Sequence, residues 1–472
     1  MSPTSLSDEH KYIGRDHSQY EELRTRYFNA RVPAAMPAAI SCPSTTADVV
    51  KAVKQAAALG QPIGVRAGGH LFPCCSLLEG GLLIDVKHLN SSIDYDASTK
   101  IISFGPGRIS KELAEACTGL NRFFPFGHSP TVAAGGFLLC GGQGWFCRGW
   151  GLTSDSWILE MEIVTAEGQV VIASREKNTD LFWAARGSGQ GFFGIVTRFW
   201  ARTMPARQLY TTTLIFNASN NWRKICIWML DTNDRTPRYG VETAAATIYA
   251  NKNSLPLGDE ITDKTLLMAI EVIAYADSEG EARTMLSEYD KIPEDLKKLL
   301  VVKTDLQHKT WKRLFDDQDA LNPCGQGERW QCDSILSSPK VSREELVRTM
   351  EGPMCDLPSR RSVGCIYIAE CYPDAADMAG SLPQQYYMST MTCWTDPTDD
   401  TRMREWMYDQ YSKASAVGVG QYIADYDVTH RKEKVMSEAN LQKWLKVRAQ
   451  WDPEERFPAY KNFAFTGIES KS

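Results

Sequence analysis

The chain lacks the long hydrophobic run that a membrane-spanning helix requires: no apolar stretch in its 472 residues approaches about 18 residues. It also lacks a basic excess, since its formal net charge is −6 at pH 7 and its pI is about 5.8. Such a chain has no positive field to attract a polyanion. We therefore expect neither a membrane nor a nucleic acid as partner, and a small-molecule substrate is favoured.

The marks of an exported or metal-binding protein are missing as well. Residues 1–10, Met-Ser-Pro-Thr-Ser-Leu-Ser-Asp-Glu-His, have neither the positive start nor the apolar centre of a signal peptide. The 13 cysteines form an odd, scattered set, which favours reduced thiols over a disulfide framework. None of them stands at zinc-ligand spacing. These absences predict a cytoplasmic protein without a metal site.

Length and residue texture divide the chain into two parts. At roughly 150 residues per domain, 472 residues suffice for two or three units. Strand and helix patterns alternate among clustered glycines up to residue 205, and long amphipathic or apolar segments follow. Residues 317–340 look like a long irregular surface loop. We therefore predict an α+β chain with one domain over 1–205 and a second over 206–429.

Hydrophobic periodicity and helix-start signals locate individual elements. The patterns predict strands at Ala38–Cys42, Pro62–Val65, Gly81–Asp85, Lys100–Phe104, Ile158–Val164, Gln169–Ala173, Ile195–Ala201, Val363–Ala369 and Tyr386–Trp394. They predict helices after the start signal Thr45–Asp48 and at Ile109–Cys117, Asp180–Ala185, Glu279–Tyr289 and Thr401–Ser415.

The stretch Arg66-Ala-Gly-Gly-His70 points most directly to chemistry. It follows an apolar strand, and its two glycines let successive backbone N–H groups turn toward one point. Such a nest binds an anion, most often a phosphate or pyrophosphate, and Arg66 is able to add a fork of donors. The alternative is a glycine-rich surface turn between two strands.

Two further glycine-rich blocks decide between these alternatives. One is Gly127–Leu152, with Gly135-Gly136 and Gly141-Gly-Gln-Gly144, and the other is Asp180–Val196. So many glycines are expected where backbone approaches a large flat ligand. Together with Arg66–His70, in this order and spacing, they resemble the FAD-linked oxidases of the berberine-bridge-enzyme type, in the vanillyl-alcohol-oxidase superfamily. The resemblance covers residues 38–205 well and 386–457 more weakly.

The resemblance implies an α+β architecture of two domains: a PCMH-type FAD-binding domain, and a substrate domain whose antiparallel sheet is backed by helices. It implies that residues 430–472 complete the first domain. It also implies that His70 bonds covalently to FAD, and that the cofactor contacts Arg66, Ala67, Gly68, Gly69, His70, Ser76, Ser129, Thr131, Val132, Gly135, Gly136, Gly141, Gly142, Gly144, Val164 and Val196.

Departures from the family pattern refine these expectations. Many relatives hold FAD by a second bond through a cysteine where this chain has Ser129, so we predict attachment through His70 only. Phe137 and Leu71 replace a histidine and a serine of the pattern and make the cavity less polar. Val132 stands where relatives control oxygen access, and its small side chain favours O2 as the electron acceptor.

The catalytic residues are less clearly marked. In the superfamily a side chain of the second domain takes a substrate proton while hydride passes to the flavin. Tyr422 is the first candidate, and Tyr426, Glu370 and Tyr387 are further ones. The predicted reaction is a two-electron oxidation of an alcohol or an activated C–H or C–N centre, with O2 reduced to H2O2. Two alternatives are a redox-neutral cyclase that retains FAD, and a binding protein without the cofactor.

Overall fold

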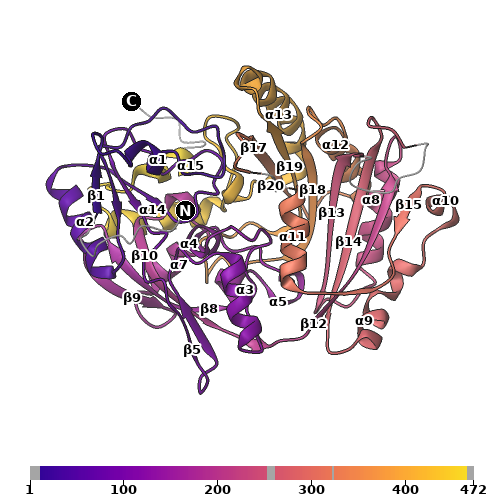
Figure 1. Cartoon of the computed structure of the whole chain (residues 1–472), viewed down its shortest axis with the longest axis horizontal. Coiled ribbons are helices and arrows are strands. Elements are labelled where there is room, and N and C mark those ends of the chain that lie inside the picture. The colour runs from indigo at the N-terminus through magenta and orange to yellow at the C-terminus, as the bar shows by residue number, and fades with distance from the viewer. Residues whose placement is uncertain (1–10, 252–260, 322–323, 465–472) are drawn as a thin grey trace.

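The computed structural model describes residues 11–251, 261–321 and 324–464. The N-terminal residues, on which the expectation of no signal peptide rests, lie outside this range. Figure 1 shows two lobes side by side, with β1 (Lys11–Gly14) and α15 (Lys461–Ala464) both in the first lobe. No helix within the described residues has the length and apolar character needed to cross a membrane.

The first lobe is built from two sheets and short helices. Its elements before residue 206 are β1 (Lys11–Gly14), α1 (Tyr20–Arg24), β2 (Ala39–Cys42), α2 (Thr46–Ala58), β3 (Ile63–Arg66), β4 (Leu82–Asp85), β5 (Ile93–Asp96), β6 (Ile101–Phe104), α3 (Ser110–Gly119), β7 (Arg122–Phe123), α4 (Ala134–Leu139), α5 (Cys147–Trp150), α6 (Thr153–Ser156), β8 (Ile158–Thr165), β9 (Val170–Ser174), α7 (Thr179–Ala185), η1 (Gly189–Gly191), β10 (Gly194–Arg202) and β11 (Met204–Pro205).

The second lobe is organised on one large sheet. Its elements are β12 (Gln208–Asn217), α8 (Trp222–Asn233), β13 (Val241–Tyr249), β14 (Leu266–Ala276), α9 (Glu279–Leu286), η2 (Ser287–Asp290), α10 (Glu294–Lys297), β15 (Leu300–Lys303), β16 (Gln307–Lys309), α11 (Trp311–Leu321), β17 (Arg329–Ser337), α12 (Arg343–Cys355), β18 (Val363–Cys371), β19 (Gln384–Trp394), η3 (Pro397–Asp399), α13 (Asp400–Ala414), η4 (Ser415–Val417) and β20 (Gly418–Gly420). The tail then forms η5 (Ile423–Asp425), α14 (Glu438–Trp451), η6 (Pro458–Tyr460) and α15 (Lys461–Ala464).

Local sequence explains the sheets of the first lobe. The smaller sheet has the order β1-β2-β4-β3, with β2, β4 and β3 parallel. Parallel strands need crossover connections, and α2 supplies the one from β2 to β3, which lie on either side of β4. Thr45 starts α2 as expected: its hydroxyl accepts from the Asp48 amide at 3.2 Å, while the Asp48 carboxylate accepts from the Thr45 amide at 3.1 Å. A capping box of this kind contributes about 1 kcal/mol.

The second sheet of the first lobe is antiparallel, in the order β5-β6-β10-β8-β9. The predicted hairpin of β8 and β9 is confirmed, with Val164 opposite Val170. Its inner face and α2 share one hydrophobic core with the helices behind the glycine-rich loops.

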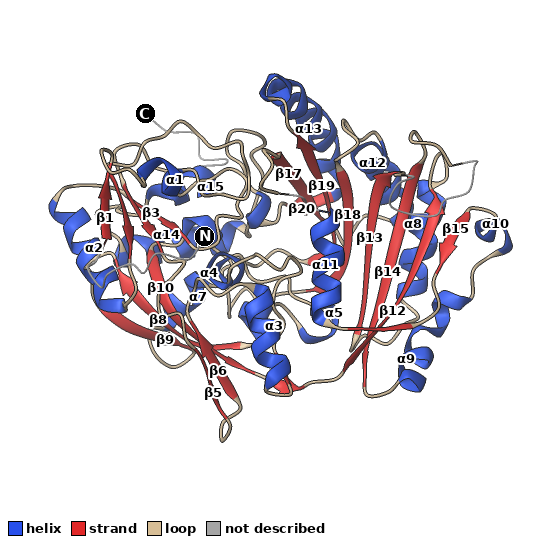
Figure 2. Cartoon of the chain, in the orientation of Figure 1, coloured by secondary structure: helices blue, strands red, loops and turns tan. Residues whose placement is uncertain are grey.

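The sheet of the second lobe is antiparallel throughout, in the order β15-β12-β14-β13-β18-β19-β17-β20, with β16 also pairing with β12. Figure 2 shows its long strands side by side. A separate core forms between this sheet and helices that include α8, α9, α12 and α13. The predicted antiparallel sheet backed by helices is thus present. Its other face is turned toward the first lobe, because α5 contacts β18 and β13.

The C-terminal tail lies against the first lobe. The indole N–H of Trp451 in α14 donates to the Asp180 carboxylate at 3.0 Å, and the amide of Ile63 donates to the Arg456 carbonyl at 2.7 Å. The tail therefore contacts the first residue of β3, the strand that leads into the glycine turn.

One sequence-based expectation about the fold is wrong. Residues 317–340 do not form a long loop, because the end of α11 and the whole of β17 lie there, and β17 pairs with β19 over eight residues from Arg329 to Leu336. β17 buries polar residues, including Gln331 and Asp333. These polar residues stand beside buried apolar ones such as Trp330 and Ile335, so the strand shows no regular hydrophobic alternation. The ion pair with Arg431 compensates the burial of Asp333.

Candidate active site

A cavity of about 360 Å³ opens between the two lobes. The first lobe lines it with residues 63–72, with the loop Gly127–Ser129 and with part of α4. The sheet contributes Tyr367 and Tyr387, and the tail contributes Tyr422 and Asp425. The predicted glycine motifs and the second lobe therefore meet at one place, as a cofactor site shared with a substrate site requires.

Backbone shape on the first-lobe side depends on glycine at particular positions. Gly69 has φ of +71°, a left-handed conformation that residues with a Cβ rarely adopt. A Cβ on Gly64 would lie 1.9 Å from the Ser76 carbonyl oxygen, so no side chain fits there. A Cβ on Gly136 would instead meet nothing within 4 Å, and Gly136 lines the cavity. The missing side chain leaves room for a flat ligand, and these residues fit FAD.

Arg66 does not play the role expected of its side chain. The guanidinium is buried and donates to Asp85 Oδ2 from Nε at 2.9 Å and from Nη2 at 2.5 Å. It also donates to the carbonyl of Leu23 at 2.7 Å. Burial raises the pKa of Asp85, but the guanidinium groups of Arg66 and Arg26 outweigh it and hold that pKa below its ordinary value. Arg66 thus fixes the loop that follows β3, and its fork is not free for phosphate.

His70 faces the cavity from the end of this loop. Its Nε2 lies 2.8 Å from the Thr131 hydroxyl, and its ring stacks on Phe28 with centroids 4.6 Å apart. By surface area His70 is half-buried, because its ring faces the cavity. Burial lowers the pKa of His70 to about 4. The imidazole is therefore neutral near pH 7, and Thr131 fixes its orientation.

The other residues predicted to bind the cofactor divide into two groups. On the cavity wall lie Ala67, Gly68, Ser76, Ser129, Val132, Gly135 and Val196. Away from it lie Gly141, Gly142, Gly144 and Val164. Gly144 is required by packing, because a Cβ there would lie 2.6 Å from the Thr153 hydroxyl. Val164 is buried in β8.

The predicted catalytic residues also divide. Tyr422 and Tyr387 line the cavity. Tyr426 and Glu370 do not. The Tyr426 hydroxyl donates to the Asn462 carbonyl at 3.0 Å, and Glu370 accepts from Arg148 at 2.7 Å. Both are occupied in contacts within the fold.

Asp425 is a cavity residue that the sequence did not single out. The Tyr387 hydroxyl donates to its Oδ2 at 2.9 Å. Burial raises the pKa of Asp425 to about 6, although the hydrogen bond from Tyr387 opposes the rise. Burial also raises the pKa of Tyr422 far above its ordinary value, so Tyr422 stays protonated. A carboxyl group that titrates near 6 is suited to accept a proton, whereas Tyr422 is suited to donate a hydrogen bond.

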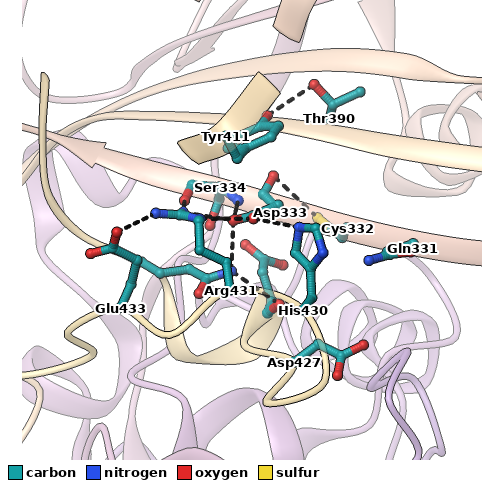
Figure 3. Close-up of polar contacts among 12 residues, drawn as sticks. Gln331, Cys332, Asp333, Ser334, Thr390, Tyr411, Asp427, His430, Arg431 and Glu433 are labelled. Atoms are coloured by element: carbon teal, nitrogen blue, oxygen red, sulfur yellow. Dashed lines mark hydrogen bonds and ion pairs between the residues drawn. The ribbon is translucent and has the colours of Figure 1, made fainter. Parts of the chain in front are cut away.

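A buried ionic cluster holds the segment that carries Tyr422 and Asp425. Figure 3 shows Arg431 and His430 converging on Asp333 of β17. Arg431 donates to both Asp333 oxygens, at 3.0 and 2.8 Å, and Gln421 Nε2 donates to Oδ1 at 2.8 Å. His430 Nε2 lies 3.0 Å from Oδ2, in ion-pair range but not aligned as a hydrogen bond. The cluster fixes the segment on both sides of Asp425.

A second pair of side chains in the cavity joins the two lobes. His128, from the loop before α4, places Nε2 2.5 Å from Glu242 Oε1 of β13. Both residues line the cavity. Neither residue was predicted, because no element was predicted at β13 and His128 lies within the glycine-rich block Gly127–Leu152.

Comparison with known proteins shows what the chain is similar to. Residues 37–174 match the family described as FAD binding domain. The chain is 29% identical over 448 residues to the FAD-linked oxidoreductase janO of Penicillium janthinellum, covering 93% of this chain and 94% of that protein. It is 35% identical over 217 residues to the xylooligosaccharide oxidase of Thermothelomyces thermophilus, covering 43% of this chain and 42% of that protein.

Solved structures with the same fold include the berberine-bridge-enzyme-like protein 1 of Physcomitrella patens. It has a TM-score of 0.81 and 19% identity, with 96% of each chain covered. Another is the 6-hydroxy-D-nicotine oxidase of Arthrobacter nicotinovorans, with a TM-score of 0.80, 18% identity and coverage of 97% of this chain and 98% of that one. At these identities the likeness concerns the fold.

Proposed function

We propose that the chain is an FAD-linked oxidoreductase of the berberine-bridge-enzyme-like type and that it oxidises a small organic molecule by two electrons within the cavity. The matched FAD binding domain, the fungal FAD-linked oxidoreductases and the shared fold support this proposal. The reacting group is an alcohol or an activated C–H or C–N centre. One observation carries this proposal: Asp425, whose pKa lies near 6, lines the same cavity as Gly68, Gly69, Gly135 and Gly136, which we call the glycine cradle.

The first-lobe wall supplies the cofactor contacts. Gly68, Gly69, Gly135 and Gly136 give FAD a backbone surface, with Val196 among the apolar residues beside it. FAD bound there would supply the two-electron redox chemistry, with O2 as the proposed electron acceptor and hydrogen peroxide as the product of its reduction.

His70 is proposed as the only covalent anchor of FAD. Its neutral imidazole has a free electron pair for bond formation, and the 2.8 Å contact with Thr131 fixes which way the ring faces. The other position used by relatives carries Ser129, whose hydroxyl lacks the nucleophilicity of a thiol. Cys140 also lines the cavity, but burial raises the pKa of its thiol and leaves it unreactive.

Asp425 is proposed to accept the proton that the substrate loses with the hydride. Above pH 6 it is a carboxylate, and the Tyr387 hydroxyl that donates to Oδ2 stabilises and orients it. Tyr422 hydrogen-bonds the substrate as a protonated donor. This assignment moves the role of base from Tyr422 to a residue three positions along the same segment.

Anaerobic mixing tests the oxidation. The purified flavoprotein is combined with a panel of aromatic and aliphatic alcohols and amines while the flavin absorbance is followed. Bleaching by one of them, followed by one hydrogen peroxide per turnover when air is admitted, is the expected result. A product formed with an unchanged flavin spectrum contradicts oxidation and indicates redox-neutral cyclisation.

Reoxidation tests O2 as the acceptor without a substrate. Val132 lines the cavity with a small side chain, which leaves room for O2. Protein reduced with dithionite is mixed with air-saturated buffer, and fast return of the flavin absorbance is expected. Val132→Leu fills that space and is expected to slow the return by at least about tenfold, whereas a wild-type protein that stays reduced in air would contradict O2 as the acceptor.

A further inference from the structure

His128 and Glu242 lie at the opposite end of a row of aromatic rings from Asp425. The His128 ring is 4.8 Å from the Tyr367 ring, and Tyr367 is 5.9 Å from Tyr387, its direct partner across β18 and β19. Tyr387 in turn donates to Asp425. The row thus crosses three strands of the sheet and ends in a polar side chain on each side.

Both oxygens of Glu242 are engaged. Oε1 pairs with His128 Nε2, and Oε2 accepts from the backbone amide of Phe146. Glu242 is almost completely buried, with 8% of its side chain exposed. Since the carboxylate accepts at both oxygens, it imposes one tautomer on a neutral His128: Nε2 carries the hydrogen, and Nδ1 carries the free electron pair.

Nδ1 of His128 is available to a ligand. Within the described residues no hydrogen bond involves this atom, and His128 lines the cavity with 16% of its side chain exposed. The ring is held between Trp145, at 4.4 Å, and Tyr367. An imidazole fixed by a carboxylate and by two aromatic rings presents its acceptor in one direction, which suits recognition more than packing.

We propose that His128 Nδ1 accepts a hydrogen bond from a hydroxyl group of the substrate, with Glu242 as the positioning residue. The cavity around it is largely apolar, with Phe28, Phe72, Phe137, Leu139, Ile368 and Met391 on its walls. The substrate class is therefore a hydrophobic, ring-containing molecule that carries a hydroxyl group at a distance from its oxidised centre. This inference rests on the proposed function in that the substrate lies in the same cavity as FAD.

Binding of two naphthalenes by the flavoprotein, measured by calorimetry, tests the proposal without turnover. The probes are 2-naphthol, which donates a hydrogen bond, and 2-methoxynaphthalene, which has the same rings and no donor. The wild-type protein is expected to bind 2-naphthol at least about tenfold more tightly, because a site built to hydrogen-bond a hydroxyl disfavours the analogue without one. His128→Phe keeps an aromatic ring in place and is expected to remove the difference.

Glu242→Gln separates a tautomer effect from loss of packing. A glutamine has one oxygen, which the Phe146 amide requires, so its NH2 group faces His128 Nε2 and moves the imidazole hydrogen to Nδ1. His128 Nδ1 then donates a hydrogen bond, and the methoxy oxygen of 2-methoxynaphthalene becomes an acceptable partner. The preference for 2-naphthol is expected to fall to within about twofold. The variant is expected to bind 2-methoxynaphthalene no more weakly than the wild-type protein does. Asp425→Asn is expected to keep the tenfold preference.

Three results would overturn the proposal. The first is that the wild-type protein shows no tenfold preference for 2-naphthol over 2-methoxynaphthalene, which includes the case that it binds neither probe. The others are that the preference survives His128→Phe or that Asp425→Asn abolishes it. Each is independent of the oxidation itself. Flavin bleaching by a substrate while the naphthalene preference is absent contradicts only the His128 site, whereas an intact preference in a protein whose flavin never bleaches contradicts only the oxidation.

Discussion

The first-lobe wall of the cavity is formed largely by backbone, whereas the sheet wall is formed by side chains. On the first-lobe wall, Gly64, Gly69 and Gly136 shape the cavity because they have no side chain. On the other, Tyr387 and Asp425 matter for groups that exchange or share protons. A cofactor common to many enzymes is recognised by a fixed surface, and a particular substrate by groups whose pKa and hydrogen bonding the protein adjusts.

The largest effect is expected on the sheet wall. Asp425→Asn keeps an acceptor for the Tyr387 hydroxyl but removes the proton acceptor, so turnover is expected to fall on the order of 10²–10⁴-fold. Flavin content stays at the wild-type level because no glycine of the cradle changes. Steady-state peroxide formation and the absorbance near 450 nm measure the two quantities. An Asn variant with wild-type turnover would show that the proton leaves by another route.

The next effect tests the support of the cradle. Asp85→Asn leaves the buried Arg66 guanidinium without its carboxylate, and the free energy of unfolding is expected to fall by roughly 3–5 kcal/mol. Urea denaturation measures it. Asp94→Asn is the matched control, because Asp94 pairs with Arg198 on the surface with 63% of its side chain exposed, and such pairs contribute about 1 kcal/mol or less. Equal losses in both variants would mean that the buried pair does not brace the loop.

A stability measurement on Asp425 distinguishes a functional group from a structural one. Its pKa lies near 6 instead of the ordinary 3.8, so the folded state binds a proton that the unfolded state releases between about pH 4 and pH 6. Wild-type stability therefore falls as pH rises through this window, by roughly 2–3 kcal/mol from this group. Asp425→Asn lacks that loss and is expected to be more stable than wild type above pH 6 and similar below pH 4, by thermal unfolding. A variant less stable than wild type at pH 7 would indicate a structural role.

The smallest effect compares two glycines. A Cβ would meet nothing within 4 Å at Gly136, on the cavity, or at Gly119, at the exposed end of α3. Both Gly→Ala variants are expected to fold, since alanine favours a helix by about 0.5–1 kcal/mol. Only Gly136→Ala is expected to lower the flavin-to-protein ratio, with an affinity loss of about tenfold, or about 1.4 kcal/mol. Equal flavin content in the two variants would remove Gly136 from the cradle.

The same contrast explains how much the sequence could predict. The cradle was predictable because glycine positions and the helix start at Thr45 are local signals that need no partner from elsewhere in the chain. Tyr387 of the sheet wall was among the candidates, and ordinary apolar patterns predicted both strands of that wall, Val363–Ala369 and Tyr386–Trp394. Tyr367 was not singled out, although its strand was predicted. The helices and strands that the sequence predicted correctly are those whose pattern is set by residues close together in the chain.

Long-range contacts account for what the sequence did not show. β17 lacks a regular apolar alternation because it also buries Asp333, and burial of that carboxylate is possible because Arg431, almost a hundred residues away, pairs with it. The expected donor fork of Arg66 depends on whether a carboxylate lies nearby, and Asp85 does. Asp425 gains its high pKa, and Glu242 its partner His128, only when the lobes and the tail come together. The order of residues along the chain does not show which distant residues come into contact.

Intact mass of the denatured protein tests the central claim most directly. The account predicts that wild type carries the mass of one FAD after denaturation, that Cys140→Ala carries it too, and that His70→Ala has the mass of the unmodified chain and releases its flavin. Flavin still bonded to His70→Ala, or absent from denatured wild type, would contradict the single anchor at the end of the glycine cradle.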